Sequence, residues 1–438
     1  MNEVSLLGEF FSDPTQDQGI AGLIHYSCSQ GVSLRFLRQI SSQWIQPAVL
    51  FGILETGEEC TLLEPVVLPR STPITYRQHN GGSTVASGEV GYKYLVVGKH
   101  LELNEAFGEA SFTFSGIGRF ATGLDLTLQS HEAPLAYCAQ TYIGKISIWR
   151  QDLSACMRNI KEAVDSDNRT ALESLSIASD AIEKEYGCFF TKRLSSEYRM
   201  IIEFNSEVSL DEVFEGVQKI IDLISLLLYS PMMAEAVCIS QGSPCAKRLK
   251  VYISQMTDER TLSIIESHRS SGDTPVRLPE ILFPNVLSTW NDEYSKYATL
   301  VSGIQSRTGI KALHEMYADI ILHCAFMESI RHEVGFAHKY GDCISRFACI
   351  GLQEKIRSVI KADYNEDIGV VISEIRADIV HFKGTRKRIS SLSVIALCEF
   401  SQYLELTVIG YLLGRLGVSG ELIERYQMSQ SATCWTGI

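Results

Sequence analysis

Two side chains near the C-terminal end of the sequence have the chemistry needed to cleave a phosphodiester. Arg376 and His381 stand with four residues between them in the segment 370–384, which reads VVISEIRADIVHFKG. An imidazole can transfer protons near neutral pH, and a guanidinium can bind and neutralise a phosphate group. We therefore interpret Arg376 and His381 as a candidate catalytic pair that needs no metal ion.

A basic segment continues from this pair. Residues 376–388 hold five cationic side chains and the carboxylate of Asp378. The cations that follow the pair are Lys383, Arg386, Lys387 and Arg388. A run of cations can hold a nucleic-acid backbone, although a solvated helix end would contain a similar run. Asp378 shares a helical face with His381, so it is a supporting candidate that would orient the imidazole.

Helical geometry complicates the pairing of Arg376 with His381. Apolar residues at positions 368, 371, 372, 375 and 379 predict a helix with one buried face. Five positions along a regular helix turn a side chain by roughly 140°, so the two residues cannot lie side by side on an ideal helix. Either the helix ends near Val380, or the arginine reaches around it, or two chains each contribute to one site.

Arginine and histidine recur at similar spacing in two other places. Arg307 precedes His314, and Arg331 precedes His338. Neither pair is followed by a basic run, so we interpret both as structural. Glu328 and Glu333 lie at helical spacing from Arg331, which predicts ordinary surface ion pairs.

Composition indicates a folded chain of two or three domains. Of its 438 residues, 45% are hydrophobic and 21% are charged, as in globular proteins. The formal charge of -13 excludes nucleic-acid binding over the whole surface and confines it to a local basic segment. The 12 cysteines are scattered and no metal-ligand spacing is present, so we expect no metal site, no cofactor and no disulfide framework.

The sequence favours a cytoplasmic location. The N-terminus lacks a basic segment followed by an apolar one, which is the pattern of a signal peptide. The most apolar run, 220–229, is interrupted by Asp222 and is too short to cross a bilayer. We therefore expect no membrane partner.

Three regions follow from the residue patterns, and together they predict an α+β multidomain fold. Residues 1–150 contain short runs of β-branched and aromatic residues between glycine turns, which predict a β-rich sandwich or barrel. Residues 151–285 predict a mixed, mainly helical connecting region, with a capping box formed by Ser209 and Glu212. Residues 286–438 have apolar residues three and four apart, which predicts an antiparallel helical bundle.

Individual elements can be placed within these regions. The predicted strands cover residues 48–54, 92–97, 111–114, 124–128, 145–149 and 188–204. The predicted C-terminal helices cover residues 291–304, 310–332, 343–361, 366–382, 390–416 and 419–427.

Several segments resemble a known family. The C-terminal helices, with Arg376 and His381 in EIRADIVH, resemble the HEPN superfamily of helical bundles. More of the chain resembles ApeA-type bacterial proteins, which join an ApeA N-terminal domain to a HEPN-like bundle. The segments that carry this likeness are LLGEFF (6–11), GILETGEECTLLE (52–64), SLDEVF (209–214) and YLLGRLGV (411–418).

The resemblance implies a function. It implies a metal-independent endoribonuclease that acts in abortive infection against phage, with RNA as substrate and a possible phage-derived trigger. It also implies a homodimer, formed through the C-terminal helices, in which two Arg/His motifs face each other. The residue after the arginine in this family is often polar, whereas here it is Ala377.

Two functions from different classes remain open at this stage. In the first, His381 acts as general base or acid in the attack of a ribose 2′-hydroxyl on the adjacent phosphate, while Arg376 stabilises the developing charge. In the second, the helical bundle is a non-catalytic binding or dimerisation module and the β-rich domain is a sensor. Ala377 and the acidic charge balance favour the second. A carbohydrate-active β-domain has little support, because no paired carboxylates stand out there.

Overall fold

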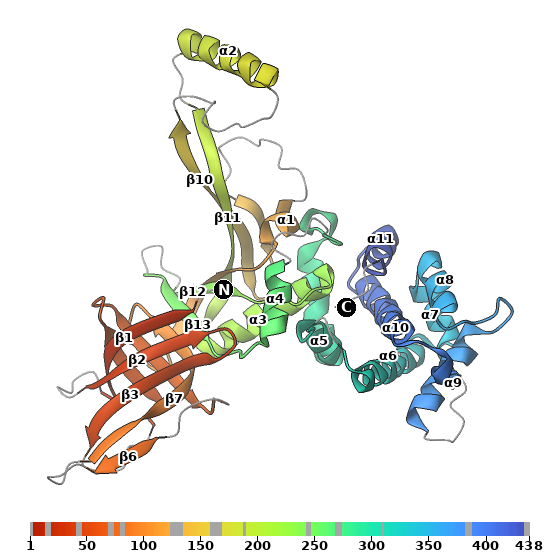
Figure 1. The fold of residues 1–438 in the computed structure, drawn as a ribbon, viewed down its shortest axis with the longest axis horizontal. Coiled ribbons are helices and arrows are strands. Elements are labelled where there is room, and N and C mark those ends of the chain that lie inside the picture. The colour runs from red at the N-terminus through yellow and green to blue at the C-terminus, as the bar shows by residue number, and fades with distance from the viewer. Residues whose placement is uncertain are drawn as a thin grey trace.

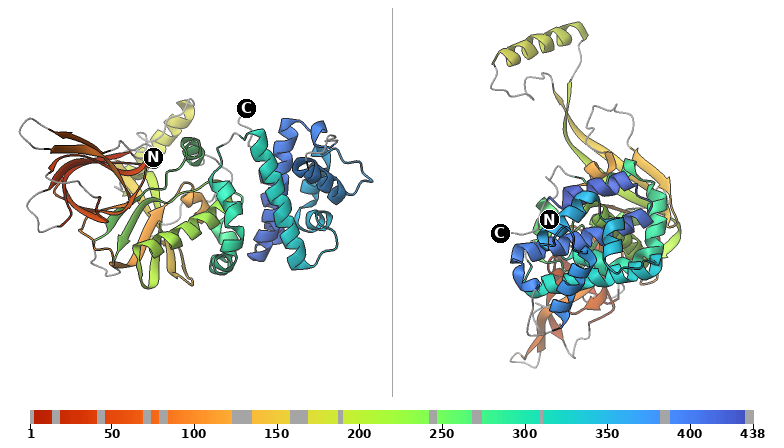
Figure 2. Two further views of the ribbon diagram at one scale, coloured as in Figure 1. Left: turned by 90° about the horizontal axis from the view of Figure 1, so that it is seen from below. Right: turned by 90° about the vertical axis from the view of Figure 1, so that its right-hand side faces the viewer.

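The protein has a β-rich part and a helical part at opposite ends of its long axis (Figures 1 and 2). The computed structural model describes residues 3–13, 19–40, 46–68, 74–78, 84–122, 135–157, 169–186, 190–241, 247–267, 274–308, 311–381 and 388–432. Within these residues, strands dominate the N-terminal part and helices follow one another from residue 283 onwards. The predicted α+β multidomain class, with an N-terminal β-barrel, is confirmed.

Six antiparallel strands close the N-terminal barrel. They are β1 (Val4–Phe11), β2 (Ile20–Ser27), β3 (Gly31–Ile40), β7 (Thr84–Val97), β5 (Glu59–Val66) and β4 (Val49–Leu54). Their order around the barrel is β1-β2-β3-β7-β5-β4, and the pairing of β4 with β1 completes the circle. Closure leaves these strands without an open edge.

Alternating side chains fill the barrel interior. Phe10, Leu34, Leu62 and Tyr92 are fully buried there. The ring of Phe10 lies against Gly52 so closely that a Cβ at position 52 would come within 2.6 Å of it. A residue with a side chain at position 52 would therefore push this ring out of place.

The sheet continues beyond the barrel through β7. This strand also pairs with β13 (Leu249–Ile253) and with the short β6 (Thr75–Gln78). After β13 come β12 (Glu235–Ser240), β8 (Ala106–Thr113), β11 (Phe190–Ser209), β10 (Gly144–Met157) and β9 (Leu135–Gln140). The outer ends of β10 and β11 form a projecting ribbon, with helix α2 (Arg169–Tyr186) beyond its tip (Figure 1). A short helix, α1 (Ile117–Thr122), follows β8.

Helix α3 (Leu210–Leu228) packs the sheet onto the helical part. The predicted capping box is confirmed, because the Ser209 hydroxyl accepts from the Glu212 backbone N–H and the Glu212 carboxylate accepts from that of Ser209. The helix is buried from Ile220 to Leu228, and it packs against α5. One large core therefore runs from the open part of the sheet into the C-terminal helices. Helix α4 (Glu259–Ser267) and the 3-10 turn η2 (Leu278–Glu280) complete this part.

Seven helices and one 3-10 turn make up the described C-terminal part. They are α5 (Phe283–Gln305), α6 (Leu313–Val334), α7 (Gly341–Phe347), α8 (Ile350–Val359), α9 (Ile368–Val380), η3 (Ile389–Ser391), α10 (Val394–Arg415) and α11 (Gly420–Gln430). Helix α10 lies at the centre, buried along most of its length, and packs against α6, α7, α8 and α11.

Most predicted elements are present, with differences that have local causes. The predicted single helix 343–361 is wrong, because the chain is extended at Ala348 and Cys349 and forms two helices. The side-chain amide of Gln427 stabilises this break by accepting from the Cys349 N–H and donating to the Phe347 carbonyl. The predicted strand 124–128 lies outside the described residues.

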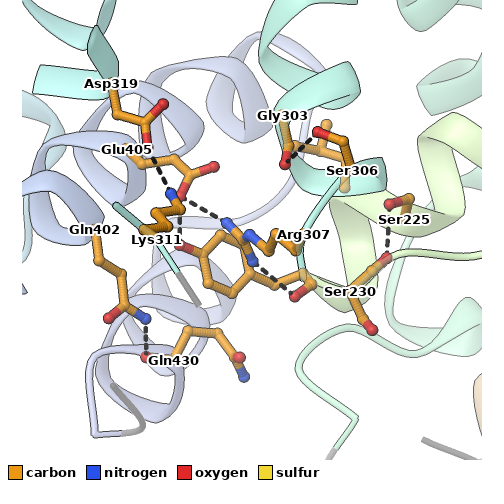
Figure 3. Close-up of polar contacts among 12 residues, drawn as sticks. Ser225, Ser230, Gly303, Ser306, Arg307, Lys311, Asp319, Gln402, Glu405 and Gln430 are labelled. Carbon is orange, nitrogen blue, oxygen red and sulfur yellow. Dashed lines mark hydrogen bonds and ion pairs between the residues drawn. The ribbon is translucent and has the colours of Figure 1, made fainter. Parts of the chain in front are cut away.

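A buried polar network around an ion pair connects the end of α3 with the C-terminal helices (Figure 3). Arg307, in the segment between α5 and α6, donates to the Glu405 carboxylate of α10 at 2.6 Å and to the Tyr229 carbonyl at 3.2 Å. The Tyr229 hydroxyl, at the end of α3, also donates to Glu405 at 2.7 Å. This network connects three segments distant in the sequence.

Among the described helices, none is long and apolar enough to cross a membrane.

Candidate functional site

Helix α9 positions the two candidate catalytic residues. Asp367 caps its N-terminus by accepting from the Gly369 N–H, and Val371, Ile372, Ile375 and Ile379 form its buried face. These apolar side chains pack α9 against α6 and α7. The predicted buried stripe is therefore present, and the residues between its members reach the surface.

The end of this helix agrees with the first of the three arrangements considered for Arg376 and His381, in which the helix stops near Val380. Helix α9 ends at Val380, and His381 is its C-cap residue, with φ -102° and ψ 109°. The His381 backbone N–H donates to the Ala377 carbonyl, while its side chain is exposed. Because the backbone leaves the helix at His381, the imidazole is not bound to the direction that five helical positions would impose.

Arg376 lies on the flank of α9 that faces α6. Its guanidinium is 3.8 Å from the carboxylate of Glu328, and its side chain is about one third exposed (34%). Its Nε atom is buried and has no hydrogen-bond partner among the described residues. The guanidinium is therefore held from one side by an acidic neighbour while part of it stays open to solvent.

Glu328 is itself held by neighbouring groups. It accepts a 2.6 Å hydrogen bond from the Tyr340 hydroxyl, and the Lys339 ammonium lies 3.8 Å away. Burial raises the pKa of Glu328, but the Tyr340 hydroxyl and the charges of Arg376 and Lys339 outweigh it, so the pKa lies below its ordinary value. Glu328 therefore carries a negative charge beside Arg376 at neutral pH.

Glu328 and Tyr340 were not predicted as part of the site. The sequence predicted that Glu328 pairs with Arg331, three residues away on the same helix. The structure places it against Arg376, which is distant in the sequence, and Arg331 donates to the Phe336 carbonyl. No local pattern signals such a contact, because it depends on how α6 packs against α9.

Asp378 and Arg388 are both engaged on the other flank of α9. The Asp378 carboxylate accepts from the backbone N–H groups of Arg388 and Ile389. Arg388 donates from its side chain to Glu374 at 2.8 Å and also pairs with Glu366. These contacts hold the start of η3 against α9. The predicted roles of Asp378 toward His381 and of Arg388 toward RNA stay predictions.

The rest of the predicted basic run cannot be placed. Lys383, Arg386 and Lys387 lie outside the described residues. Among the residues that are described, no group of three His, Cys, Asp or Glu side chains could hold a metal ion.

The other Arg/His pairs have different surroundings. Arg307 is buried in the ion pair with Glu405, whereas His314 is exposed in the first turn of α6. His338 is exposed beyond the end of the same helix. The structural interpretation of Arg307 is confirmed by its contacts, and the pair at Arg376 combines a half-buried guanidinium with an exposed imidazole at one helix end.

The family is settled by the N-terminal part. The family model for ApeA N-terminal domain 1 matches residues 5–290, well over half of the chain. The chain belongs to this ApeA family. The match covers the barrel, the open sheet and the helices up to Trp290, so the region around Arg376 lies beyond it. No curated protein and no solved structure matches the chain.

Proposed function

We propose that this ApeA-family chain is a metal-independent endoribonuclease that acts in the cytoplasm in abortive infection against phage. The observation that supports the proposal is that α9 carries both residues within its last two turns and C-cap, with the Arg376 side chain partly open to solvent and His381 exposed. Family membership supports the defence role, because the match spans the N-terminal domain that gives the family its name. The C-terminal bundle is proposed to be of the HEPN type.

In this mechanism the two residues divide the chemistry. His381 accepts the proton of a ribose 2′-hydroxyl as its oxygen bonds to the adjacent phosphorus, and the bond to the 5′-oxygen breaks. A protonated imidazole returns a proton to the leaving 5′-oxygen. Arg376 neutralises the charge that develops on the phosphoryl oxygens. The products are a 2′,3′-cyclic phosphate and a 5′-hydroxyl, and DNA is spared because it has no 2′-hydroxyl.

The active form is proposed to be a homodimer formed through α9. The outward face of this helix presents Val370, Ser373, Ala377 and Val380, and the two valines are 55% and 42% exposed. Small and apolar residues along one helix face suit close contact with a second helix. His381 lies at the end of this face, so a partner chain packed on it would bring a second Arg/His pair close.

The N-terminal barrel is proposed to be the sensor. It lies at the opposite end of the molecule from α9 (Figure 2). A nuclease that attacks cellular RNA must be inactive until infection, and a separate domain that receives a phage-derived trigger would provide that control. RNA is then the substrate of the bundle and the trigger is the partner of the barrel.

A cleavage assay with matched histidine variants tests the nuclease. Purified wild type, His381→Ala and His338→Ala are incubated with RNA in EDTA, and products are resolved on a sequencing gel. His338 is the control because it is an exposed histidine in a similar Arg/His spacing. We expect His381→Ala to lose at least about a hundredfold of the cleavage rate, as for a general acid or base, while His338→Ala keeps it. Cleavage by His381→Ala at the wild-type rate would remove this residue from the mechanism.

The alternative is a non-catalytic dimerisation module. It is favoured by Ala377, which is exposed at the position where the family often has a polar residue, and by the contact of Arg376 with Glu328. Both proposed functions require a dimer through α9, and sedimentation analysis measures it. The bulky cation in Ala377→Arg should prevent the contact between the two helices. If the wild type forms a dimer but does not cleave RNA even with the trigger present, the alternative is supported. If Ala377→Arg still forms the same dimer, the outward face of α9 is not the dimer interface.

A further inference from the structure

A large cavity opens beside the C-terminal half of α10. It is lined by the segment from the end of α7 to the start of α8, by α10 and by α11, and its volume is about 680 Å³. This volume lies in the range of small-molecule sites. None of the lining residues belongs to α9, so the cavity is separate from the proposed nuclease site.

Two glycines of α10 form the cavity floor. Gly410 passes under the Phe347 carbonyl, where a Cβ would come within 2.4 Å. Gly414 has more space, because the nearest atom to a Cβ there is the Ile423 side chain at 3.8 Å. Gly410 therefore lets α10 pack closely against the break between α7 and α8, whereas the missing side chain at Gly414 leaves open space in the cavity. Gly414 is therefore a position where a larger residue would fill the cavity without disturbing the helix.

The cavity walls combine aromatic and apolar surface. The rings of Phe347 and Tyr411 meet edge to face with centroids 4.9 Å apart. Val418 and Ile423 extend this surface. The amide of Gln427 also lines the cavity, but its oxygen and nitrogen are bound to backbone groups around the break between α7 and α8. A flat apolar molecule would find contacts here.

The charged side chains that line the cavity determine which ligand charge it favours. Arg346 and Arg415 line it, against the carboxylate of Glu424. Arg415 is paired with Glu293 at 2.6 Å and is also close to Glu333. The exposed guanidinium of Arg346 presents a planar fork of N–H groups that suits a carboxylate, sulfonate or phosphate.

We propose that this cavity binds a small organic anion with a flat apolar body. The apolar body lies against Phe347 and Tyr411, and the anionic group pairs with Arg346. Arg415 is already paired with glutamates and Glu424 opposes the anion, so binding is weaker than Arg346 alone would give. The proposal does not depend on RNA cleavage, because the site shares no residue with Arg376 and His381.

A fluorescence titration with 1-anilinonaphthalene-8-sulfonate tests the site, since this probe is an aromatic anion whose emission rises in apolar surroundings. We expect Gly414→Leu to abolish binding at the cavity and Arg346→Gln to weaken it about tenfold, the effect of losing one charge-assisted contact. Glu424→Gln should tighten it. Gly303→Leu is the matched control, because Gly303 is a helical glycine in α5 with nothing within 4 Å of an added Cβ.

Unfolding midpoints confirm that each variant is folded. The proposal is overturned if Gly414→Leu and Arg346→Gln bind the probe as the wild type does, or if Gly303→Leu loses binding equally. Competition then distinguishes the ligand sources. Displacement by uridine monophosphate indicates a nucleotide, and displacement by indole-3-acetate indicates an aryl carboxylate. If neither displaces the probe at a hundredfold excess over the protein, the proposed ligand class is wrong.

Discussion

The buried pair of Arg307 and Glu405 should show strong energetic coupling. Their side chains are only 4% and 7% exposed, and the guanidinium lies 3.9 Å from the centroid of the Tyr229 ring. Burial raises the pKa of Glu405, but the neighbouring groups, Arg307 foremost, together hold it below its ordinary value, so both groups are charged at neutral pH. Removal of either partner leaves the other charge buried without its oppositely charged neighbour.

The expected magnitudes follow from this burial. Glu405→Leu or Arg307→Met should each lower the free energy of unfolding by about 3–5 kcal/mol, which is the usual cost of breaking a buried pair. The double variant replaces both charges with apolar groups of similar size, so its loss should be much smaller than the sum of the single losses. The coupling energy should therefore be about 3 kcal/mol or more.

Urea unfolding followed by circular dichroism at 222 nm measures these free energies. This wavelength reports the loss of helix, and the pair connects α3 and α10 with the segment before α6. The surface pair of Lys145 and Glu203 is the control, with a 2.8 Å contact between side chains that are 46% and 48% exposed. Its coupling should be much smaller than that of the buried pair, because solvent screens the two exposed charges. If the losses at Arg307 and Glu405 simply add, or if Glu405→Leu costs no more than the surface variant, the reasoning from burial is wrong.

Two further predictions concern single groups. Burial lowers the pKa of His323 despite the carboxylates of Glu405 and Asp319, so the folded state binds this proton less readily than the unfolded state. The contribution of neutral His323 to the free energy of unfolding should therefore be complete above pH 6.5, its ordinary pKa, and should decrease as the pH falls below that value. Urea unfolding measured between pH 7.5 and 5.5 should show a smaller decrease in the free energy of unfolding for His323→Gln than for the wild type. Glu328→Gln should reduce RNA cleavage only about two- to fivefold, because a partly exposed pair is worth under about 1 kcal/mol. If Glu328→Gln lost as much cleavage as Arg376→Ala, this expectation would be wrong, because Glu328 would then contribute as much as the guanidinium beside it.

Local signals explain which elements could be predicted. The capping box at Ser209 lies within one helical turn, and the apolar stripe of α9 repeats along a single helix, so both were visible in the sequence. The break at Cys349 was not, because the groups that stabilise it come from Gln427 on α11. Barrel closure was equally hidden, since β3 pairs with β7 across a long separation along the chain.

The candidate site divides in the same way. Arg376 and His381 could be selected because their chemistry and spacing are written in one short segment. Glu328 could not, because its contact with Arg376 requires α6 to pack beside α9. Asp378 lies on α9, but its carboxylate contacts the backbone N–H groups of Arg388 and Ile389, and a helical wheel does not include residues beyond the helix.

Strand β7 determines how the chain can be divided. Its residues contribute to both hydrophobic cores, with Tyr92 and Leu95 inside the barrel and Tyr94 and Val96 in the larger core. A shortened protein that begins at Gly98 would lose not only the barrel but also the neighbour of β13, which would expose an unpaired strand and invite aggregation. The roles of the barrel and the bundle therefore have to be distinguished with point substitutions in the full chain rather than with truncated proteins. A trigger bound to the barrel would act on a strand that is already part of the molecule's main core.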